Sequence, residues 1–262
     1  MIKFKLELIP EQGIVKPYIE PYGYIFRALF MNWLKKLGPK IVHDLHAHNK
    51  IRPYSIKISY RPTKLIFYLN TFDSTLSTIL INDLINKKDK NFTIDNQKFL
   101  LKKVVFEEFS LKKLLKEAKT VRNFKIEFLE PTYFNTKRGN NVIRLPIPEL
   151  IFSNLLNLWN ELYDGVVHIQ KDDLIEWIKK NIFPSSLEIK TKAKEMGENV
   201  PAVGIIGWAN FVITNNNFNY AKYIDCLGKF GELSNIGGNR TAGLGVIKYS
   251  ALEYFEKYKS SS

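Results

Sequence analysis

Three of the four histidines of this chain fall within one short segment, together with two cationic side chains. They are His43, His46 and His48, and Lys50 and Arg52 follow within the next four residues. Histidine gives or takes a proton near neutral pH, and lysine stabilises charge that develops on a phosphate. This combination suits cleavage of RNA, because the 2′-hydroxyl of RNA is itself the nucleophile. The segment therefore predicts general acid–base chemistry on a phosphodiester, with no metal ion and no other cofactor.

Two other interpretations of the histidine segment have to be weighed. Histidines at the end of a helix also complement the helix dipole, and residue types alone do not separate this capping role from catalysis. A zinc site is disfavoured, because His43 and His46 lie one turn apart but only Asp44 stands near as a further ligand. The residues disfavour a metal site and leave catalysis and capping undecided.

A glycine-rich segment near the C-terminus, residues 235–245, is the second candidate for function. Its four glycines leave backbone N–H groups bare, so that they can approach a phosphate chain closely. A nucleotide-binding P-loop is excluded, since Leu244 stands where lysine would follow Gly243 and no helix comes next. The alternative is a plain glycine turn before an edge strand. The residues expected to bind RNA are Gly237, Gly238, Asn239, Arg240, Gly243 and Gly245, with Asn239 and Arg240 at the apex.

The composition favours a polyanionic partner, most often nucleic acid. The formal net charge is +13 and the sequence pI is about 9.5, while 45% hydrophobic residues are ample for a packed core. The single cysteine, Cys226, excludes an internal disulfide or a cysteine-built metal site. No apolar run approaches the roughly 18 residues of a membrane span, and the N-terminus alternates like a strand. We therefore expect a cytoplasmic protein with no membrane partner.

The elements that must position these residues alternate between strands and helices. In the first strand Ile2, Phe4, Leu6 and Leu8 point one way, and the charged residues between them point the other. The pattern then predicts helices over 22–37 and 40–48, strands over 54–60 and 64–70, a helix over 74–86, and a strand over 98–106 in a hairpin with 92–95. This order, β-α-β-β-α-β, is the ferredoxin-like arrangement.

The second half repeats the same order. Strands are predicted over 124–129, 187–194, 202–214 and 244–250, with helices over 148–162, 171–181 and 220–231. The fold class is therefore α+β, with two tandem ferredoxin-like (RRM-like) domains. We expect an N-terminal domain over 1–110 with the histidines, a connector over 111–122, and a C-terminal domain over 123–262 with the glycine-rich segment.

These motifs resemble a known family. The glycine-rich segment is similar to the C-terminal signature of the RAMP superfamily of CRISPR-associated proteins, with Asn235 in place of its first glycine. The N-terminal order resembles the repeat-processing CRISPR endoribonucleases, through Leu45-His46 and a Tyr54-Ser55 pair that opens a strand. Pro131-Thr132 and the strand over 204–208 are similar to the family's later motifs, so the resemblance covers nearly the whole chain.

The resemblance implies an endoribonuclease that cleaves precursor CRISPR RNA within its repeats and makes guide RNAs. Family members cleave without a metal ion and leave 2′,3′-cyclic phosphate and 5′-hydroxyl ends. His46 and Lys50 match the family's catalytic histidine and lysine, whereas His43 and His48 remain rivals, and the acid or base role of His46 stays open. Archaeal relatives have a tyrosine late in the first helix, where this chain has Met31, which leaves Tyr22 and Tyr24 as candidates for that role.

The partner implied by the resemblance is CRISPR repeat RNA, contacted by Arg52 and the glycine-rich segment. The alternative function is a non-catalytic RNA-binding subunit of a CRISPR effector complex, which has the same fold and glycine signature. Such a subunit does not need the histidine–lysine segment, which favours the nuclease. Binding to an effector complex and a homodimer both stay open, because the sequence does not fix the assembly.

Overall fold

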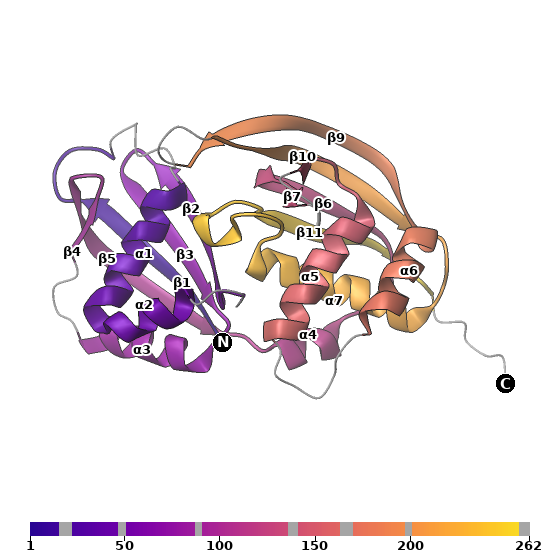
Figure 1. The fold of residues 1–262 in the computed structure, drawn as a ribbon, viewed down its shortest axis with the longest axis horizontal. Helices are drawn as coiled ribbons and strands as arrows, with labels where there is room; N and C mark the ends of the chain where they lie inside the picture. Colours follow the sequence, from indigo (N-terminus) through magenta and orange to yellow (C-terminus); the bar gives the residue numbers. More distant parts are fainter. Residues whose placement is uncertain are drawn as a thin grey trace. The chain divides into compact units, whose positions relative to one another are not determined.

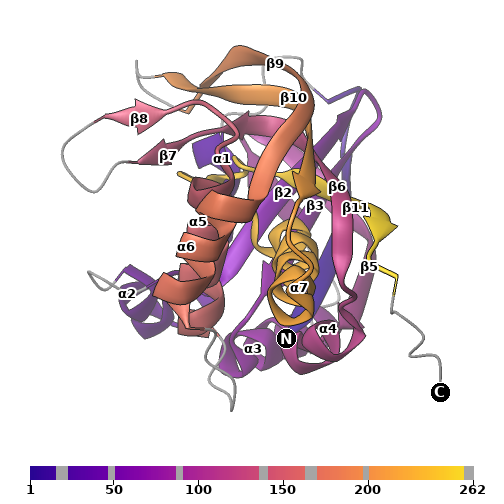
Figure 2. The same ribbon diagram turned by 90° about the vertical axis from the view of Figure 1, so that its right-hand side faces the viewer.

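The chain forms two compact units, each of them a sheet with helices packed against it (Figures 1 and 2). The computed structural model describes residues 1–15, 23–46, 51–86, 91–135, 141–162, 170–196 and 201–256. The first unit comprises Met1–Ser110 with two later segments, Ala193–Val203 and Gly238–Leu244. The sequence placed residues 123–262 in one C-terminal domain. The structure instead groups the middle of the glycine-rich segment with the first unit.

The first unit is built on a five-stranded antiparallel sheet with the strand order β2-β3-β1-β5-β4. The ferredoxin-like order is present in β2, β3, β1 and β5, and the short β4 extends the sheet as a hairpin with β5. Its elements in chain order are β1 (Ile2–Pro10), α1 (Gly23–Leu37), α2 (Pro39–His46), β2 (Tyr54–Arg61), β3 (Lys64–Thr71), α3 (Ser74–Asn86), β4 (Asn91–Ile94) and β5 (Gln97–Glu108).

Alternation along the strands decides which face of this sheet is buried. Phe4 and Leu6 of β1 are 1% exposed and pack with Phe26 and Phe30 of α1, so helices cover this face. The register pairs Leu6 with Phe67 of β3, whose side chain is also buried. Because successive strand residues point to opposite faces, the lysines of β1 lie on the other side of the sheet.

The second unit has a four-stranded antiparallel sheet in the order β11-β6-β10-β9, again the ferredoxin-like order (Figure 2). Phe124, Ile126 and Phe128 of β6 are at most 2% exposed, and the Phe124 ring lies 5.8 Å from the ring of Phe152 in α5. Its elements are α4 (Leu111–Glu117), β6 (Val121–Thr132), the hairpin of β7 (Phe134–Asn135) and β8 (Val142–Ile143), α5 (Pro148–Leu162), α6 (Lys171–Asn181), β9 (Ile182–Glu195), β10 (Pro201–Ile213), α7 (Phe218–Ser234) and β11 (Ile247–Tyr254).

The prediction of tandem ferredoxin-like folds is confirmed by these two strand orders. The last strand begins three residues later than predicted, at Ile247, because Arg240–Ala242 form a 3₁₀ turn, η2, between Asn239 and Gly243 in left-handed conformations. None of the helices in the described ranges is long and apolar enough to cross a membrane.

Candidate functional site

Helix α2 carries the first of the predicted catalytic histidines. Ile41, Val42 and Leu45 pack on the core of the first unit, which leaves His43 on the solvent side with 87% of its side chain exposed. The Nδ1 atom of His43 lies 3.6 Å from the Oδ1 atom of its neighbour Asp44. An exposed imidazole of this kind is accessible to a substrate and is a side chain type used in general acid–base catalysis.

The preferred candidate, His46, is the last residue of α2. Its backbone is described, but its side chain is not among the described parts of the chain, and His48 and Lys50 lie outside the described residues. The arrangement of His46 and Lys50 therefore stays a prediction. His46 stands three residues beyond His43 in the sequence of α2.

The tyrosine candidates lie at the start of α1. Tyr24 is in the first turn and is 41% exposed, whereas Tyr22 lies outside the described residues. Met31, at the position where archaeal relatives have tyrosine, is partly buried against the core. Tyr24 is therefore the described phenol on α1 that is open to solvent.

Arg52 precedes β2, and its backbone is held by a residue from the far end of the chain, Arg240. The guanidinium of Arg240, in η2, donates one hydrogen bond to the carbonyl oxygen of Tyr54 at 2.7 Å and another to the carbonyl oxygen of Arg52. Arg240 is only 8% exposed. The sequence predicted that Arg240, at the apex of the loop, binds RNA; in the structure its side chain is instead turned inward onto the protein's own backbone.

The pKa values of Arg240 and of the nearby Tyr54 are shifted mainly because both side chains are buried. Burial lowers the pKa of Arg240 to about 10; the Tyr54 phenol opposes this shift and the charge of Arg52 adds to it. Burial also raises the pKa of the Tyr54 phenol, against the nearby charges of Arg27, Arg52 and Arg240. Arg240 therefore stays charged at neutral pH, while Tyr54 stays protonated. This buried pair organises the segment that follows the histidines.

Two glycines of the glycine-rich segment are explained by close backbone packing. Gly237 and Gly245 have φ angles of +72° and +66°, in the left-handed region that favours glycine. A Cβ atom on Gly245 would overlap the carbonyl oxygen of Ile236, and one on Gly237 would overlap that of Tyr133. The sequence assigned these glycines to phosphate contact, whereas the structure fills the space beside them with the protein's own carbonyl groups.

The remaining residues of the segment differ in exposure. Gly238 and Asn239 are half-buried, and Gly243 is buried with a φ of +84° that closes the 3₁₀ turn. Asn239 also has a left-handed backbone, with a φ of +54°. Gly237, Gly238 and Asn239 are therefore the least buried of the predicted RNA-binding residues in this segment.

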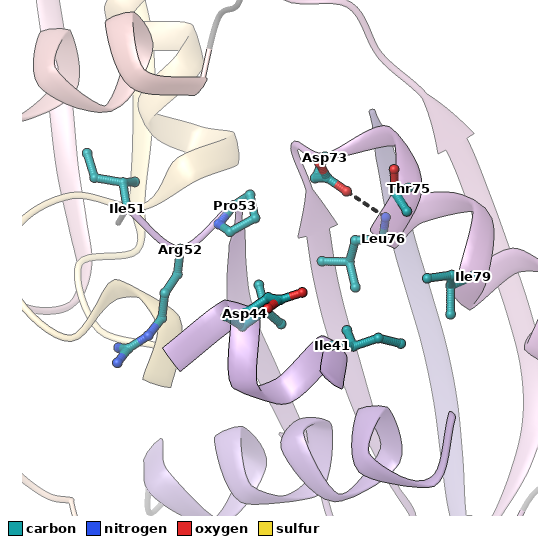
Figure 3. Close-up of a pocket in the computed structure, with 10 residues that line it drawn as sticks. Ile41, Asp44, Ile51, Arg52, Pro53, Asp73, Thr75, Leu76 and Ile79 are labelled. Atoms are coloured by element: carbon teal, nitrogen blue, oxygen red, sulfur yellow. Dashed lines mark hydrogen bonds between the residues drawn. The ribbon is translucent and has the colours of Figure 1, made fainter. Parts of the chain in front are cut away.

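A pocket of about 330 Å³ lies next to α2 within the first unit (Figure 3). Its walls come from α2, residues 51–53 and the start of α3, and its charged lining groups include Asp44 and Asp73. The Asp73 carboxylate caps α3 by accepting a hydrogen bond from the backbone N–H of Leu76 at 2.6 Å. Figure 3 shows the Arg52 side chain directed away from Asp44 and from α3. The lining also includes Arg52 and Thr75, but the two carboxylates do not suit a phosphate.

Sequence reasoning missed the buried role of Arg240 and the partners of Tyr54. No local signal reveals them, because Arg240 and Tyr54 are 186 residues apart. In the described part of the chain, no three His, Cys, Asp or Glu side chains gather as a metal site would require.

Comparison with known proteins relates part of the chain to one family. Residues 126–247 match the family model of CRISPR-associated endoribonuclease Cas6. The CRISPR-associated endoribonuclease Cas6 of Mycobacterium tuberculosis is 30% identical over 139 residues, which is 52% of this chain and 41% of that protein. The aligned part is thus less than half of the relative.

Solved structures show the same fold over nearly the whole chain. A Cas6 product complex superposes with a TM-score of 0.78 at 18% identity, covering 95% of this chain and 99% of that one. A Cas6 structure from Thermus thermophilus gives 0.73 at 19% identity, covering 95% and 98%. The resemblance predicted from the sequence is confirmed: residues 126–247 carry the sequence of the Cas6 family of CRISPR-associated endoribonucleases, on the fold of solved Cas6 structures.

Proposed function

We propose that this protein cleaves precursor CRISPR RNA within its repeats, without a metal ion, to make guide RNAs. The observation that carries the proposal is the match of residues 126–247 to the Cas6 endoribonuclease family. The product complex among the similar folds supports it, since that relative holds the product of a reaction. The net charge of +13 suits an RNA substrate.

The proposed reaction needs a base, an acid and a cation. The base takes the proton of the 2′-hydroxyl, the 2′-oxygen forms a bond to phosphorus, and the bond from phosphorus to the 5′-oxygen breaks. The acid supplies a proton to that leaving oxygen, so the products are a 2′,3′-cyclic phosphate and a 5′-hydroxyl. We assign one proton transfer to His46 and stabilisation of the charged phosphorane to Lys50.

His43 is the rival for this proton transfer, and a specific contact supports it. Its ring is exposed and lies 3.6 Å from the Asp44 carboxylate, so an imidazolium at His43 has a counter-charge. Tyr24, exposed at the start of α1, is the described side chain proposed to supply the second proton-transfer group. Arg52, Gly238 and Asn239 are proposed to hold the RNA backbone.

The test is incubation of the purified protein with a repeat RNA in excess EDTA. We expect cleavage at one site, with a 3′-terminal phosphate that resists phosphatase until acid opens the cyclic ester. Cleavage that EDTA abolishes and Mg²⁺ restores overturns the metal-independent mechanism. Tight binding of the repeat RNA with no cleavage overturns the nuclease assignment and supports a non-catalytic RNA-binding subunit.

A further inference from the structure

Three side chains form a row across the sheet of the first unit. Lys5 of β1 and Lys57 of β2 are both paired in register with Tyr68 of β3, the strand between them. The Nζ atoms of Lys5 and Lys57 lie 5.9 Å and 5.6 Å from the centre of the Tyr68 ring. We call these three residues the Tyr68 row.

The Tyr68 row faces away from the helices. Phe67 and Leu69, on either side of Tyr68 in β3, are buried in the core together with the helices. Tyr68 therefore points to the opposite face of the sheet. Lys5 and Lys57 are exposed, and Tyr68 is half-buried, so the row is open to solvent in the folded chain.

The face of the sheet that carries the Tyr68 row is positively charged around these three residues. The carboxylate of Glu7 is paired with Lys64 at 2.8 Å, and that of Glu107 with Lys3 at 3.4 Å. Among the residues that the structure describes, neither Lys5 nor Lys57 has a carboxylate within 4 Å. The pKa of Glu7 is lowered mainly by its hydrogen bond from Lys64, and the charges of Lys103 and Lys5 add to this. Within the described part of the chain, the row therefore presents an aromatic ring between two cations that form no ion pair.

We infer that the Tyr68 row binds a single-stranded segment of RNA, with a base stacked on Tyr68 and phosphates on Lys5 and Lys57. This rests on the proposed function only for the identity of the polyanion. The strand order β2-β3-β1-β5 within this sheet is that of RRM domains, which use an aromatic ring on the open face as a stacking platform for bases, and lysines beside such a ring contact the RNA backbone. An acidic protein partner would need the cations but gains little from the ring between them.

The present lysine–ring contacts do not compete strongly with this binding. Both ammonium groups lie near the limit of about 6 Å at which cation–π attraction is useful, and at exposed sites this attraction is weak. Stacking of a base on an aromatic side chain is stronger than one such contact. We therefore expect the lysines to turn to the phosphates as the base stacks.

The test measures affinity for a labelled single-stranded oligouridylate of about 12 nucleotides, by fluorescence anisotropy over a series of salt concentrations. We expect Tyr68→Leu to weaken binding by about 5- to 150-fold, the range of one base stack, whereas Tyr68→Phe binds like the wild type. Lys5→Gln/Lys57→Gln should lower the log–log salt slope by about 1.4, two phosphate contacts on a single strand.

Lys112→Gln/Lys116→Gln is the matched control, because it removes the same charge from exposed positions on α4. It should leave the salt slope unchanged. Thermal melts of all variants show that they are folded. Wild-type affinity of a folded Tyr68→Leu protein, or an equal slope change in the control, overturns the inference.

Cleavage of repeat RNA is measured in parallel. If the wild type cleaves but Tyr68→Leu binds normally, only this inference fails. If the wild type does not cleave but Tyr68→Leu loses affinity, only the proposed function fails.

Discussion

The guanidinium of Arg240 donates a hydrogen bond to the carbonyl oxygen of Tyr54 at 2.7 Å, across 186 residues of chain. A second bond reaches the carbonyl oxygen of Arg52. These two carbonyls belong to the segment that joins the histidines of α2 to β2. The contact therefore ties the glycine-rich segment to the backbone that follows the proposed catalytic residues, and it does so inside the first unit.

Replacement of Arg240 is expected to reduce stability. Arg240→Ala leaves one buried and one part-buried carbonyl group without their charged donor, which costs about 2–4 kcal/mol. Arg240→Lys keeps the charge but cannot donate to both carbonyls as a fork, so its loss should be about half as large. Urea unfolding at pH 7 measures both values.

The same variants distinguish a structural from an RNA-binding role of Arg240. A direct phosphate contact would lower the log–log salt slope of RNA affinity by about 0.7 in Arg240→Ala. From its burial we expect no change in slope for the folded protein. A slope that falls by about 0.7 with unchanged stability would show that Arg240 reaches the RNA.

His46→Ala is expected to lower the single-turnover rate of RNA cleavage by about 10²–10⁴, the usual effect of removing a general acid or base. RNA affinity should hardly change, because a neutral imidazole contributes little to phosphate binding. His43→Ala and His48→Ala should each cost about tenfold or less. An inactive His43→Ala protein beside an active His46→Ala protein would move the assignment to the His43–Asp44 pair.

Gly245→Ala is expected to destabilise the protein by about 2–5 kcal/mol. The left-handed backbone costs an L-residue about 1–2 kcal/mol, and overpacking against the Ile236 carbonyl adds about 1–3 kcal/mol. Gly13→Ala is the matched control, since Gly13 has a φ of +70° but open space around its Cβ position. Gly13→Ala should cost only the backbone contribution of about 1–2 kcal/mol. Equal losses in thermal or urea unfolding would mean that the Ile236 contact relaxes freely.

Alkaline pH is expected to lower the free energy of unfolding of the second unit, because its buried Cys226 thiol ionises more readily in the unfolded chain. Burial raises the pKa of Cys226 to about 12, and the charge of Asp225 adds to this. Burial likewise raises the pKa of Tyr249 well above its usual value. A group whose pKa is higher in the folded state binds more protons folded than unfolded. Its contribution is therefore complete below the unfolded pKa, near 9 for Cys226, and is lost as the pH rises towards 12.

Urea midpoints between pH 8 and pH 11 measure this loss. Cys226→Ala should make the decline with pH shallower between pH 9 and pH 11, because one of the two groups is gone. An identical decline in Cys226→Ala would assign the whole effect to tyrosines. Tyr249 is the first of these, since its hydroxyl donates to the buried Asp225 carboxylate at 3.1 Å.

The amino-acid sequence by itself determined the elements and their order. Strict alternation in β1 places Phe4 and Leu6 on one face and Lys5 on the other, and this depends only on the period of a strand. Local patterns of this kind are sufficient for two ferredoxin-like orders, because each strand and helix records its buried face in its own residues. The glycine signature and Leu45-His46 likewise indicate the family through residue types and spacing alone.

Only the tertiary structure decided what the glycine-rich segment does. From the sequence, Arg240 is a cation in a polar loop, and such residues usually face solvent. Its burial depends on carbonyl groups of Arg52 and Tyr54 that folding brings to it from the other end of the chain. The Tyr68 row was hidden for the same reason, since Lys5, Lys57 and Tyr68 become neighbours only through the pairing of three strands. Contacts between distant residues depend on register and packing, and no short stretch of sequence contains that information.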